Sequence, residues 1–529
     1  MNAEQQAVIQ AIQQTLGQFK AHLLAGVTGS GKTEVYLQLA DQVLERTQSV
    51  LILVPEIALT PQLEQRYNAR FSHGVTVIHS GLTEHARERA WHYIRLGITP
   101  CVVGTRSMIL NPIPRLGLII VDEEHEPAYK QQDGLRYSAR DMAIIRAQRA
   151  HCPVILGTAT PSLESVLNVQ RQRYQLHHMH QRAGGAKPPQ MSILDIRDQP
   201  LQSGISQPLC DAIQATLAAD EQVIVYLNRR GYAPVLTCYS CGWISECTQC
   251  DAYQTMHRAA AQMRCHHCGA QHSIPTCCPA CGQPDIHPLG QGTEQIGDFL
   301  QAEFPHVPLI RIDRDATSRK GSLQSLITQV HATGAALLVG TQMLAKGHHF
   351  PRVTLVGVLD ADSGLYSADF RGSERMAQLL MQVAGRAGRG ERPGRVLIQS
   401  RQPEHPMLQT LLRDGYTAFT QVALTERRAV GYPPYSHQIL IRAEARKPEP
   451  PEHYLDTLAT WVRQQSTPVE CWGPVPTPMA RRVGKYRAQL LLQTTQRPAL
   501  HQLTDHICHY LREHPPGRGI QWHLDVDPL

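Results

Sequence analysis

Eight consecutive residues near the start of the chain form a complete phosphate-binding pattern. They are Gly26, Val27, Thr28, Gly29, Ser30, Gly31, Lys32 and Thr33. The pattern follows the apolar, strand-like HLLA and opens the helix-like EVYLQLADQVL, which is the context it requires. Its glycines let backbone N–H groups curl around phosphate oxygens, and a helix N-terminus favours negative charge. We therefore predict an ATP site rather than an ordinary glycine-rich turn, with Lys32 bridging the β- and γ-phosphates and the Thr33 hydroxyl ligating Mg²⁺.

A short acidic segment follows another apolar stretch about ninety residues later. Asp122, Glu123, Glu124 and His125 come directly after LGLIIV. Alone, such a segment is as often a solvated turn as a catalytic site. Together with the phosphate loop, it indicates a Walker B motif. We predict that Asp122 holds Mg²⁺ through water and that Glu123 orients and deprotonates the attacking water.

Two arginines far downstream have the spacing to complete this site. Arg386 and Arg389 lie three residues apart in QVAGRAGR, so both project from one helical turn. Guanidinium groups placed in this way can reach a γ-phosphate from across a cleft. An isolated pair is usually a basic helix face on the surface, so its functional interpretation depends on the ATP motifs upstream. With those motifs present, we predict two catalytic arginines that complete the site when two lobes close.

Eight cysteines form four CxxC pairs within a short stretch of the chain. They are Cys238, Cys241, Cys247, Cys250, Cys265, Cys268, Cys278 and Cys281. Each pair has the spacing of a zinc knuckle, and two knuckles complete a tetrahedron of thiolates at about 2.3 Å from the ion. Eight sulfurs make two closed sites, which predicts two structural Zn²⁺ ions rather than a catalytic one. The spacing does not fix which pairs share an ion. His266, His267 and His272 could substitute for a cysteine, but the eight cysteines suffice for both sites, so we expect these histidines to be bystanders.

The stretches that must position these residues alternate between strand-like and helix-like. Short apolar runs such as SVLILVP, AALLVGTQM and VTLVGVLDAD are separated by longer polar-periodic segments, and the cysteine block interrupts this rhythm. The pattern is typical of βαβ units around buried parallel sheets, so the predicted fold class is α/β. The expected parts are a first lobe (1–185), a second lobe (186–235 and 285–404), a zinc-binding insertion (236–284) and an α+β C-terminal domain (405–529).

Composition narrows the class of protein. The 529 residues suffice for roughly three to four domains, and they are 42% hydrophobic and 18% charged. No apolar run approaches the length of a membrane span, and the polar N-terminus MNAEQQAVIQAIQQ lacks the features of an export signal. We therefore expect a cytoplasmic protein without a membrane partner, in which clustered CxxC pairs indicate metal rather than disulfides. The net charge of +6 is compatible with a polyanionic partner.

The ordered motifs resemble those of the superfamily 2 helicases. They are GVTGSGKT (26–33), LVPEIALTPQ (53–62), GTRS (104–107), DEEH (122–125), GTATP (157–161), YLNRRG (226–231), GTQMLAKGHHF (340–350) and QVAGRAGR (382–389). Their combination with YKQQ, the eight-cysteine insertion and the C-terminal GPVP, GKYR and DVDP is similar to the primosomal replication-restart helicases. The resemblance implies two RecA-like lobes, with the zinc insertion in the second. The family usually places DNA-binding domains before this core, whereas here the core begins at Met1. We therefore expect the family's motor activity in this chain, while the resemblance implies less about how it would recognise a fork.

The resemblance also implies roles for residues around the nucleotide. Asn2 and Gln5 occupy the positions at which the family reads adenine. Thr158 and Thr160 would couple hydrolysis to lobe movement, and the two arginines of QVAGRAGR would supply the arginine-finger function. The implied zinc order is nested. It places Cys238, Cys241, Cys278 and Cys281 on one ion, and Cys247, Cys250, Cys265 and Cys268 on the other.

For the DNA, the resemblance implies contacts in both lobes. The residues implied to touch the DNA backbone are Thr105, Thr341 and Lys346. The segment 129–141 resembles the family's aromatic-rich loop, which links DNA contact to the ATP site. Tyr129 and Tyr137 are its stacking candidates, and Leu135 stands where an aromatic residue is common.

These motifs predict an ATP-dependent 3′→5′ DNA helicase. By resemblance it would unwind branched or stalled replication forks and initiate primosome assembly for replication restart. The expected partners are single-stranded and forked DNA, primosome proteins and single-strand-binding protein, and a monomer is expected. The alternative is an ATP-switched scaffold for primosome assembly with little unwinding. An RNA helicase is less favoured, because the DEEH and GTAT motifs and the zinc insertion match the DNA-restart family.

Overall fold

The chain forms two compact units. Unit 1 comprises residues 1–228 and 300–425, and unit 2 comprises residues 229–299 and 426–529. The computed structural model describes residues 1–55, 61–71, 74–79, 81–182, 188–227, 235–238, 240–257, 262–265, 268–289, 293–313, 322–345, 350–367, 369–388 and 392–528. Within this described part of the chain, no helix combines the length and the apolar composition of a membrane span.

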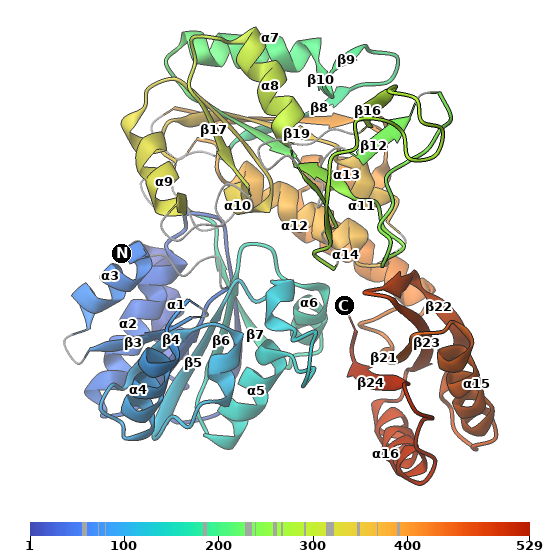
Figure 1. Cartoon of the computed structure of the whole chain (residues 1–529). Helices are drawn as coiled ribbons and strands as arrows, with labels where there is room; N and C mark the ends of the chain where they lie inside the picture. Colours follow the sequence, from blue (N-terminus) through green and yellow to red (C-terminus); the bar gives the residue numbers. More distant parts are fainter. Residues whose placement is uncertain are drawn as a thin grey trace. The chain divides into compact units, whose positions relative to one another are not determined.

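The first sheet of unit 1 is fully parallel, with strand order β3-β4-β2-β5-β6-β1-β7. Its strands are β1 (Ala21–Gly26), β2 (Ser49–Leu53), β3 (Val75–Ile78), β4 (Cys101–Gly104), β5 (Leu116–Asp122), β6 (Val154–Thr158) and β7 (Tyr174–Met179). The connecting helices are α1 (Ala3–Gln13), α2 (Lys32–Glu45), α3 (Pro61–Arg70), α4 (Glu84–Arg95), α5 (Ala139–Arg149) and α6 (Leu163–Gln170), with short 3₁₀ turns η2 (Arg106–Leu110) and η3 (Pro127–Tyr129). Figure 1 shows these elements in blue to turquoise. We call them the first lobe.

Apolar residues explain why this sheet lies between two layers of helices. Leu23 and Leu51 belong to one buried cluster, whereas their neighbours Leu24 and Val50 belong to another. Because successive side chains of a strand point to opposite faces, both faces of the sheet are buried. This burial accounts for the nearly continuous apolar runs in the sequence.

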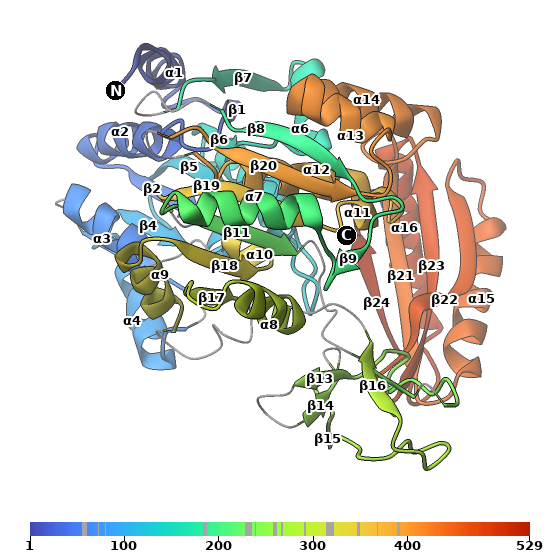
Figure 2. The same cartoon turned by 90° about the horizontal axis from the view of Figure 1, so that it is seen from above.

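The second sheet of unit 1 is also parallel, with strand order β17-β18-β11-β19-β20-β8. Its strands are β8 (Gln190–Asp195), β11 (Gln222–Leu227), β17 (Leu309–Ile312), β18 (Ala336–Gly340), β19 (Val353–Leu359) and β20 (Arg395–Ser400), with a separate small ribbon of β9 (Leu201–Gln202) and β10 (Ile205–Ser206). The helices are α7 (Gln207–Ala218), α8 (Thr293–Glu303), α9 (Ser322–Ala332), α10 (Gln342–Ala345), α11 (Asp362–Leu365), α12 (Gly372–Ala384), α13 (Pro406–Arg413) and α14 (Gly415–Ala429). Figure 2 shows the strands side by side. We call these elements the second lobe.

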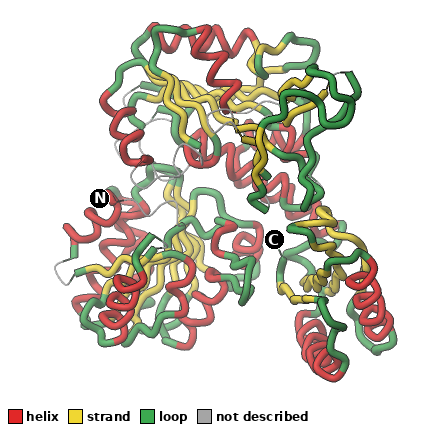
Figure 3. Tube along the Cα trace, viewed as in Figure 1, coloured by secondary structure: helices red, strands yellow, loops and turns green. Residues whose placement is uncertain are grey.

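Unit 2 combines small cysteine-rich ribbons with an antiparallel domain. The ribbons are β12 (Val235–Cys238) with β16 (Ile286–Leu289), and β13 (Thr255–His257), β14 (Gln262–Arg264) and β15 (Gln271–Ser273). The C-terminal sheet has the order β22-β23-β21-β24, formed by β21 (His437–Ala445), β22 (Glu470–Arg482), β23 (Lys485–Thr494) and β24 (Gln521–Val526). Helices α15 (Glu449–Arg463) and α16 (Arg497–Glu513) share one apolar core with this sheet. In Figure 3 the cysteine-rich part is mostly loop. The predicted α/β fold class, with parallel sheets, a cysteine-rich insertion and an α+β C-terminal domain, is confirmed.

Candidate functional site

The predicted phosphate loop joins the end of β1 to the start of α2. Gly26 ends the strand, and Gly31 precedes the helix in a left-handed conformation with φ of +83°. Glycine is required there for two reasons, because this φ strains other residues and because a Cβ would collide with the amide of Gln5. Lys32 Nζ donates a hydrogen bond to the Gly26 carbonyl at 2.7 Å. The amine is therefore held over the loop that it is predicted to serve.

Gln5 connects the first helix to the phosphate loop. Its backbone N–H donates to Asn2 Oδ1 at 2.8 Å, and its Oε1 accepts from the Asn2 N–H at 2.9 Å, forming a capping box. Its Nε2 donates to the Ser30 carbonyl at 3.0 Å. The predicted adenine-reading side chain is thus buried against the phosphate loop and positions Ser30.

Asp122 ends β5 in a half-buried position near Lys32 of the phosphate loop. Tyr36, one helical turn after Lys32, donates its hydroxyl to Asp122 Oδ1 at 2.9 Å. A Cβ at Gly157 would collide with that hydroxyl, so glycine at this position of GTATP leaves room for it. Burial, together with the adjacent Glu123 carboxylate, raises the pKa of Asp122 to about 6, while Lys32 and the Tyr36 hydroxyl act to lower it.

This shift predicts a pH dependence. If Asp122 holds Mg²⁺ as the sequence predicts, it must be ionised, so the KM for Mg²⁺-ATP should rise as the pH falls through about 6. Tyr36→Phe removes a hydrogen bond that stabilises the carboxylate, so the midpoint should move to higher pH. KM measured from pH 5 to 8 for both proteins tests this, and a midpoint that moves down in Tyr36→Phe would contradict it.

Glu123 is held in an uncommon backbone conformation. Its φ is +48°, which is rare for a residue with a side chain and is found preferentially at functional sites. Its Oε2 accepts no hydrogen bond from any described residue and lies 3.7 Å from His125 Nδ1. A carboxylate oxygen left without a donor suits a group that is predicted to accept a proton from water.

His125 links the two lobes. Its Nδ1 lies 2.7 Å from Thr158 Oγ1, and its Nε2 lies 2.6 Å from Nε2 of Gln382 on α12. Because an amide nitrogen only donates, His125 Nε2 accepts and Nδ1 carries the proton that is donated to Thr158. Thr158 Oγ1 also accepts the backbone N–H of Thr160 at 2.9 Å. The DEEH, GTATP and QVAGRAGR segments therefore share one chain of hydrogen bonds within unit 1.

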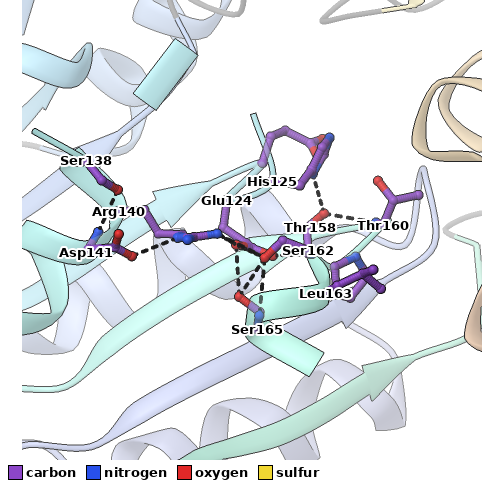
Figure 4. A network of polar contacts seen from close by, with 12 residues as sticks. Glu124, His125, Ser138, Arg140, Asp141, Thr158, Thr160, Ser162, Leu163 and Ser165 are labelled. Atoms are coloured by element: carbon purple, nitrogen blue, oxygen red, sulfur yellow. Dashed lines mark hydrogen bonds and ion pairs between the residues drawn. The ribbon is translucent and has the colours of Figure 1, made fainter. Parts of the chain in front are cut away.

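Glu124 is the centre of a second, buried network, shown in Figure 4. Its Oε1 accepts the Ser162 N–H at 2.8 Å, and its Oε2 accepts the hydroxyls of Ser162 and Ser165, both at 3.0 Å. Arg140 Nη1 on α5 lies 3.2 Å from Oε2 and compensates its charge. The carboxylate thus fixes the start of α6 to the end of β5.

Glu374 continues this connection into the second lobe. Its side chain is buried, and its Oε1 accepts the backbone N–H of Leu163, the first residue of α6, at 3.0 Å. Tyr416 of α14 donates its hydroxyl to the Pro161 carbonyl at 2.9 Å. The second lobe therefore holds the GTATP loop and the helix after it from two positions.

The arginine motif lies against the phosphate loop. A Cβ built at Gly385 would lie 2.6 Å from Thr28 Oγ1, so only glycine at this position leaves room for the Thr28 side chain. Arg386 is buried and interacts with other residues of the protein. Arg389 lies outside the described residues.

The DNA-contact candidates are only partly placed. Lys346 lies outside the described residues, while Thr105 follows β4 and Thr341 follows β18. Tyr129 is buried, with its hydroxyl 2.6 Å from the Asp122 carbonyl, so the prediction that it stacks on a base is wrong. Tyr137 is partly exposed and remains a stacking candidate.

The eight cysteines form two groups whose geometry fits zinc. Cys238, Cys241, Cys278 and Cys281 form one group, and Cys247, Cys250, Cys265 and Cys268 form the other. The two groups contain the same cysteines as the nested order that the family resemblance implied. The Sγ atoms of Cys238 and Cys281 are 3.7 Å apart, and those of Cys247 and Cys268 are 3.6 Å apart. A tetrahedron with metal–sulfur bonds of about 2.3 Å has edges of roughly 3.8 Å, so each group can hold one Zn²⁺.

The second cysteine group is attached to the C-terminal sheet within unit 2. The Val483 N–H, in the turn between β22 and β23, donates to Cys250 Sγ at 3.2 Å. Backbone hydrogen bonds join Asp251 to Arg481 at 2.9 Å and Gly484 to Gln249 at 2.8 Å. An N–H donor to a thiolate is a typical second partner of a metal ligand. The turn therefore supports the knuckle that contains Cys250.

Sequence reasoning missed three residues of the ATP site. Glu124 lies inside the DEEH motif, yet only the structure gives its partners. Tyr36 could have been found from its place four residues after Lys32 on the same helix face. Glu374 lies outside every motif, and no local signal indicates it.

Comparisons with known proteins agree with this arrangement. A family model described as DEAD/DEAH box helicase matches residues 2–169, and one described as Primosomal protein N C-terminal domain matches residues 428–529. The chain is 46% identical over 512 residues to Replication restart protein PriA of Haemophilus influenzae, covering 96% of this chain and 70% of that protein. It is 38% identical to the protein of the same name from Bacillus subtilis, covering 99% and 66%, and 43% identical to that of Synechocystis, covering 89% and 58%.

Similar solved structures include RecG bound to a three-way DNA junction, with a TM-score of 0.45 and 15% identity over 80% of this chain and 46% of that one. Another is Mss116p bound to single-stranded RNA and AMP-PNP, with a TM-score of 0.47 and 12% identity over 79% and 76%.

Proposed function

The chain belongs to the family of replication restart proteins named PriA, and from that premise we propose that it is an ATP-dependent 3′→5′ DNA helicase. It carries the DEAD/DEAH helicase domain of that family. The direction of movement and the preference for DNA rest on family membership. The observation that best supports a motor is the set of contacts between the lobes, in which His125 meets Gln382, Leu163 meets Glu374 and Thr28 meets Gly385.

In the proposed mechanism, Lys32 would neutralise the β- and γ-phosphates, and Thr33 and Asp122 would hold the Mg²⁺ that accompanies ATP. Glu123 takes the proton of the attacking water. Arg386 and Arg389 stabilise the charge that develops on the transferred phosphoryl group. When bound, Mg²⁺ would add positive charge beside the phosphates.

Lobe movement is coupled to hydrolysis through groups that touch both lobes. The γ-phosphate would be bound by the phosphate loop of the first lobe and by Arg386 and Arg389 of the second lobe. Its loss on hydrolysis removes this connection between the lobes. The hydrogen bonds through His125 and Glu374 then have to rearrange, and the GTATP loop moves with them. Thr105, Thr341 and Lys346 are proposed to hold the DNA backbone, so that this movement displaces the strand.

The division into two lobes, a zinc-binding insertion (236–284) and a C-terminal domain is part of the proposal. The sequence places the start of the C-terminal domain at residue 405, and we propose residue 426 instead, because residues up to Thr425 belong to unit 1. Two structural Zn²⁺ ions would hold the insertion, and the proposed catalytic and nucleotide-binding residues lie outside it. The proposed partners are forked and single-stranded DNA, primosome proteins and single-strand-binding protein. The matched relatives are longer than this chain, so action on stalled forks and primosome assembly are proposed for the motor as part of such a protein.

The proposal is tested by unwinding of a synthetic DNA fork with one fluorescent strand. Strand separation is expected with ATP, none with AMP-PNP, and none for an RNA duplex of the same sequence. If ATP changes DNA or partner binding without separating strands, the ATP-switched scaffold would replace the helicase. Separation of the RNA duplex at the same rate would contradict the preference for DNA.

Glu374 provides a test of coupling between the lobes. Glu374→Ala removes a buried hydrogen bond between a carboxylate and a backbone N–H, which is worth about 1.5–3 kcal/mol. We expect kcat of the DNA-stimulated ATPase to fall about tenfold with a smaller change in KM for ATP. Glu374→Gln keeps the acceptor Oε1 and should retain most activity. Glu404→Ala, at a side chain that is 83% exposed, is the control, and equal losses in Glu374→Ala and this control would refute the role.

A further inference from the structure

A hollow of the first lobe lies at the carboxyl ends of β2, β3 and β4, which are neighbours in the sheet. Its lining includes Val54 after β2, Ile78 at the end of β3 and Thr105 after β4. It has a volume of about 500 Å³, which is within the range of small-ligand sites. Ligands of parallel α/β sheets bind at this end of the strands. The position and the size of the hollow therefore both suit a ligand.

An indole ring forms part of the wall of this hollow. Trp91 of α4 lies outside every helicase motif of the sequence, is half-buried and belongs to the lining. The guanidinium of Arg95, which is not a lining residue, lies 5.4 Å from the centre of the ring and holds it by a cation–π contact. Tyr129 also belongs to the lining, but it is buried with its hydroxyl on backbone carbonyls. Trp91 rather than Tyr129 is therefore available for stacking.

The polar part of the lining suits phosphate groups. Arg87 is exposed and lies four residues before Trp91, on the same face of α4. Arg106 adds a second positive charge, and Thr105 and Ser107 add hydroxyl donors. No carboxylate is among the described residues that line the hollow. Positive charge, hydroxyl donors and an aromatic ring are together the groups that bind single-stranded nucleic acids.

We propose that this hollow binds one nucleobase of single-stranded DNA, stacked on Trp91, while Arg87 and the hydroxyls of GTRS hold the adjoining phosphates. The proposal rests on the proposed function, in which Thr105 contacts the DNA backbone. Because Thr105 also lines the hollow, a strand held there would bring a base to Trp91. Every base has a face on which it can stack, so this contact would hold the strand without reading its sequence. A motor that moves along DNA requires such tolerance.

The test compares two fluorescein-labelled dodecamers, one of thymidine and one whose sugars all lack bases, with binding to the full chain followed by fluorescence anisotropy. Trp91→Ala should bind the thymidine strand about tenfold more weakly, because it removes one base–aromatic stack. It should bind the strand without bases as the unmodified chain does, since the phosphate contacts remain. Trp91→Phe keeps an aromatic ring and should restore most of the affinity.

Tyr93→Ala is the matched control. It removes an aromatic side chain of the same helix that is 43% exposed and does not line the hollow, so both strands should bind normally. Arg87→Gln tests the phosphate contact instead. It should weaken both strands equally and reduce the slope of log affinity against log salt concentration by about 0.7.

The outcomes separate this site from the helicase itself. Equal affinities of Trp91→Ala and the unmodified chain for the thymidine strand would overturn the base site, while fork unwinding by the unmodified chain would leave the helicase in place. An equal loss for both strands in Trp91→Ala, at an unchanged melting temperature, would also overturn it. If the unmodified chain bound neither strand, both proposals would fail. If dTMP bound as tightly as the thymidine strand and lost affinity in Trp91→Ala, the hollow would take a free nucleotide instead.

Discussion

Lys32→Ala is expected to abolish ATP hydrolysis and strand separation. The amine already lies 2.7 Å from the Gly26 carbonyl, over the loop that must accommodate the phosphates. Without this amine, the loop has no lysine to neutralise the charge that develops on the β- and γ-phosphates. Loss of one such electrostatic partner costs roughly 100- to 1000-fold in kcat. Steady-state phosphate release and fork unwinding, measured on the same preparation, check this result.

Zinc content and the binding of partner proteins should not change in Lys32→Ala, because the cysteine groups belong to unit 2 and Lys32 belongs to unit 1. Lys447→Ala removes an exposed lysine of unit 2 and serves as the control. If partner binding were lost together with hydrolysis, ATP would control assembly, which favours the scaffold. Hydrolysis within a factor of about two of the unmodified chain would refute the assignment of the phosphate site.

The second large effect is expected from the double variant Cys247→Ser, Cys250→Ser. It removes half of one four-cysteine group, so the bound zinc should fall from two ions to one. It also removes the sulfur that accepts the Val483 N–H, which loosens the turn between β22 and β23. We expect unwinding to be lost while most DNA-stimulated ATPase activity remains, because the phosphate loop and Asp122 lie in unit 1.

Zinc is measured by elemental analysis, and unwinding and ATPase activity are measured in parallel. Cys277→Ser is the matched control, since Cys277 is exposed and belongs to neither group. It should keep two zinc ions and full unwinding. A fall in ATPase activity equal to the fall in unwinding would show that the cysteine-rich part is not separable from the motor.

Much of the fold is predictable because its determinants are local. Strands such as β2 and β5 are buried on both faces, which produces continuous apolar runs. The phosphate loop follows from glycine spacing between a strand and a helix. The cysteine pairs are equally local, but their nested grouping depends on how β12 pairs with β16, so spacing alone leaves it open.

The contacts between distant segments could not be predicted. Glu374 meets Leu163 across 211 positions in the chain, and His125 meets Gln382 across 257. Such pairs depend on the packing of two separately formed sheets. Tyr129 illustrates the same limit. In the sequence it is an aromatic residue in a polar loop, which is typical of a base-stacking residue, and only the structure shows that its hydroxyl lies beside the Asp122 carbonyl.

The central claim, movement in the 3′→5′ direction powered by ATP, is tested most directly with two partial duplexes that differ only in the polarity of a single-stranded tail. The strand with the 3′ tail is the one on which such a motor loads and moves toward the duplex. We predict ATP-dependent displacement from the 3′-tailed substrate and little from the 5′-tailed one. Displacement from the 5′-tailed substrate alone, or equally from both, would contradict the proposed direction.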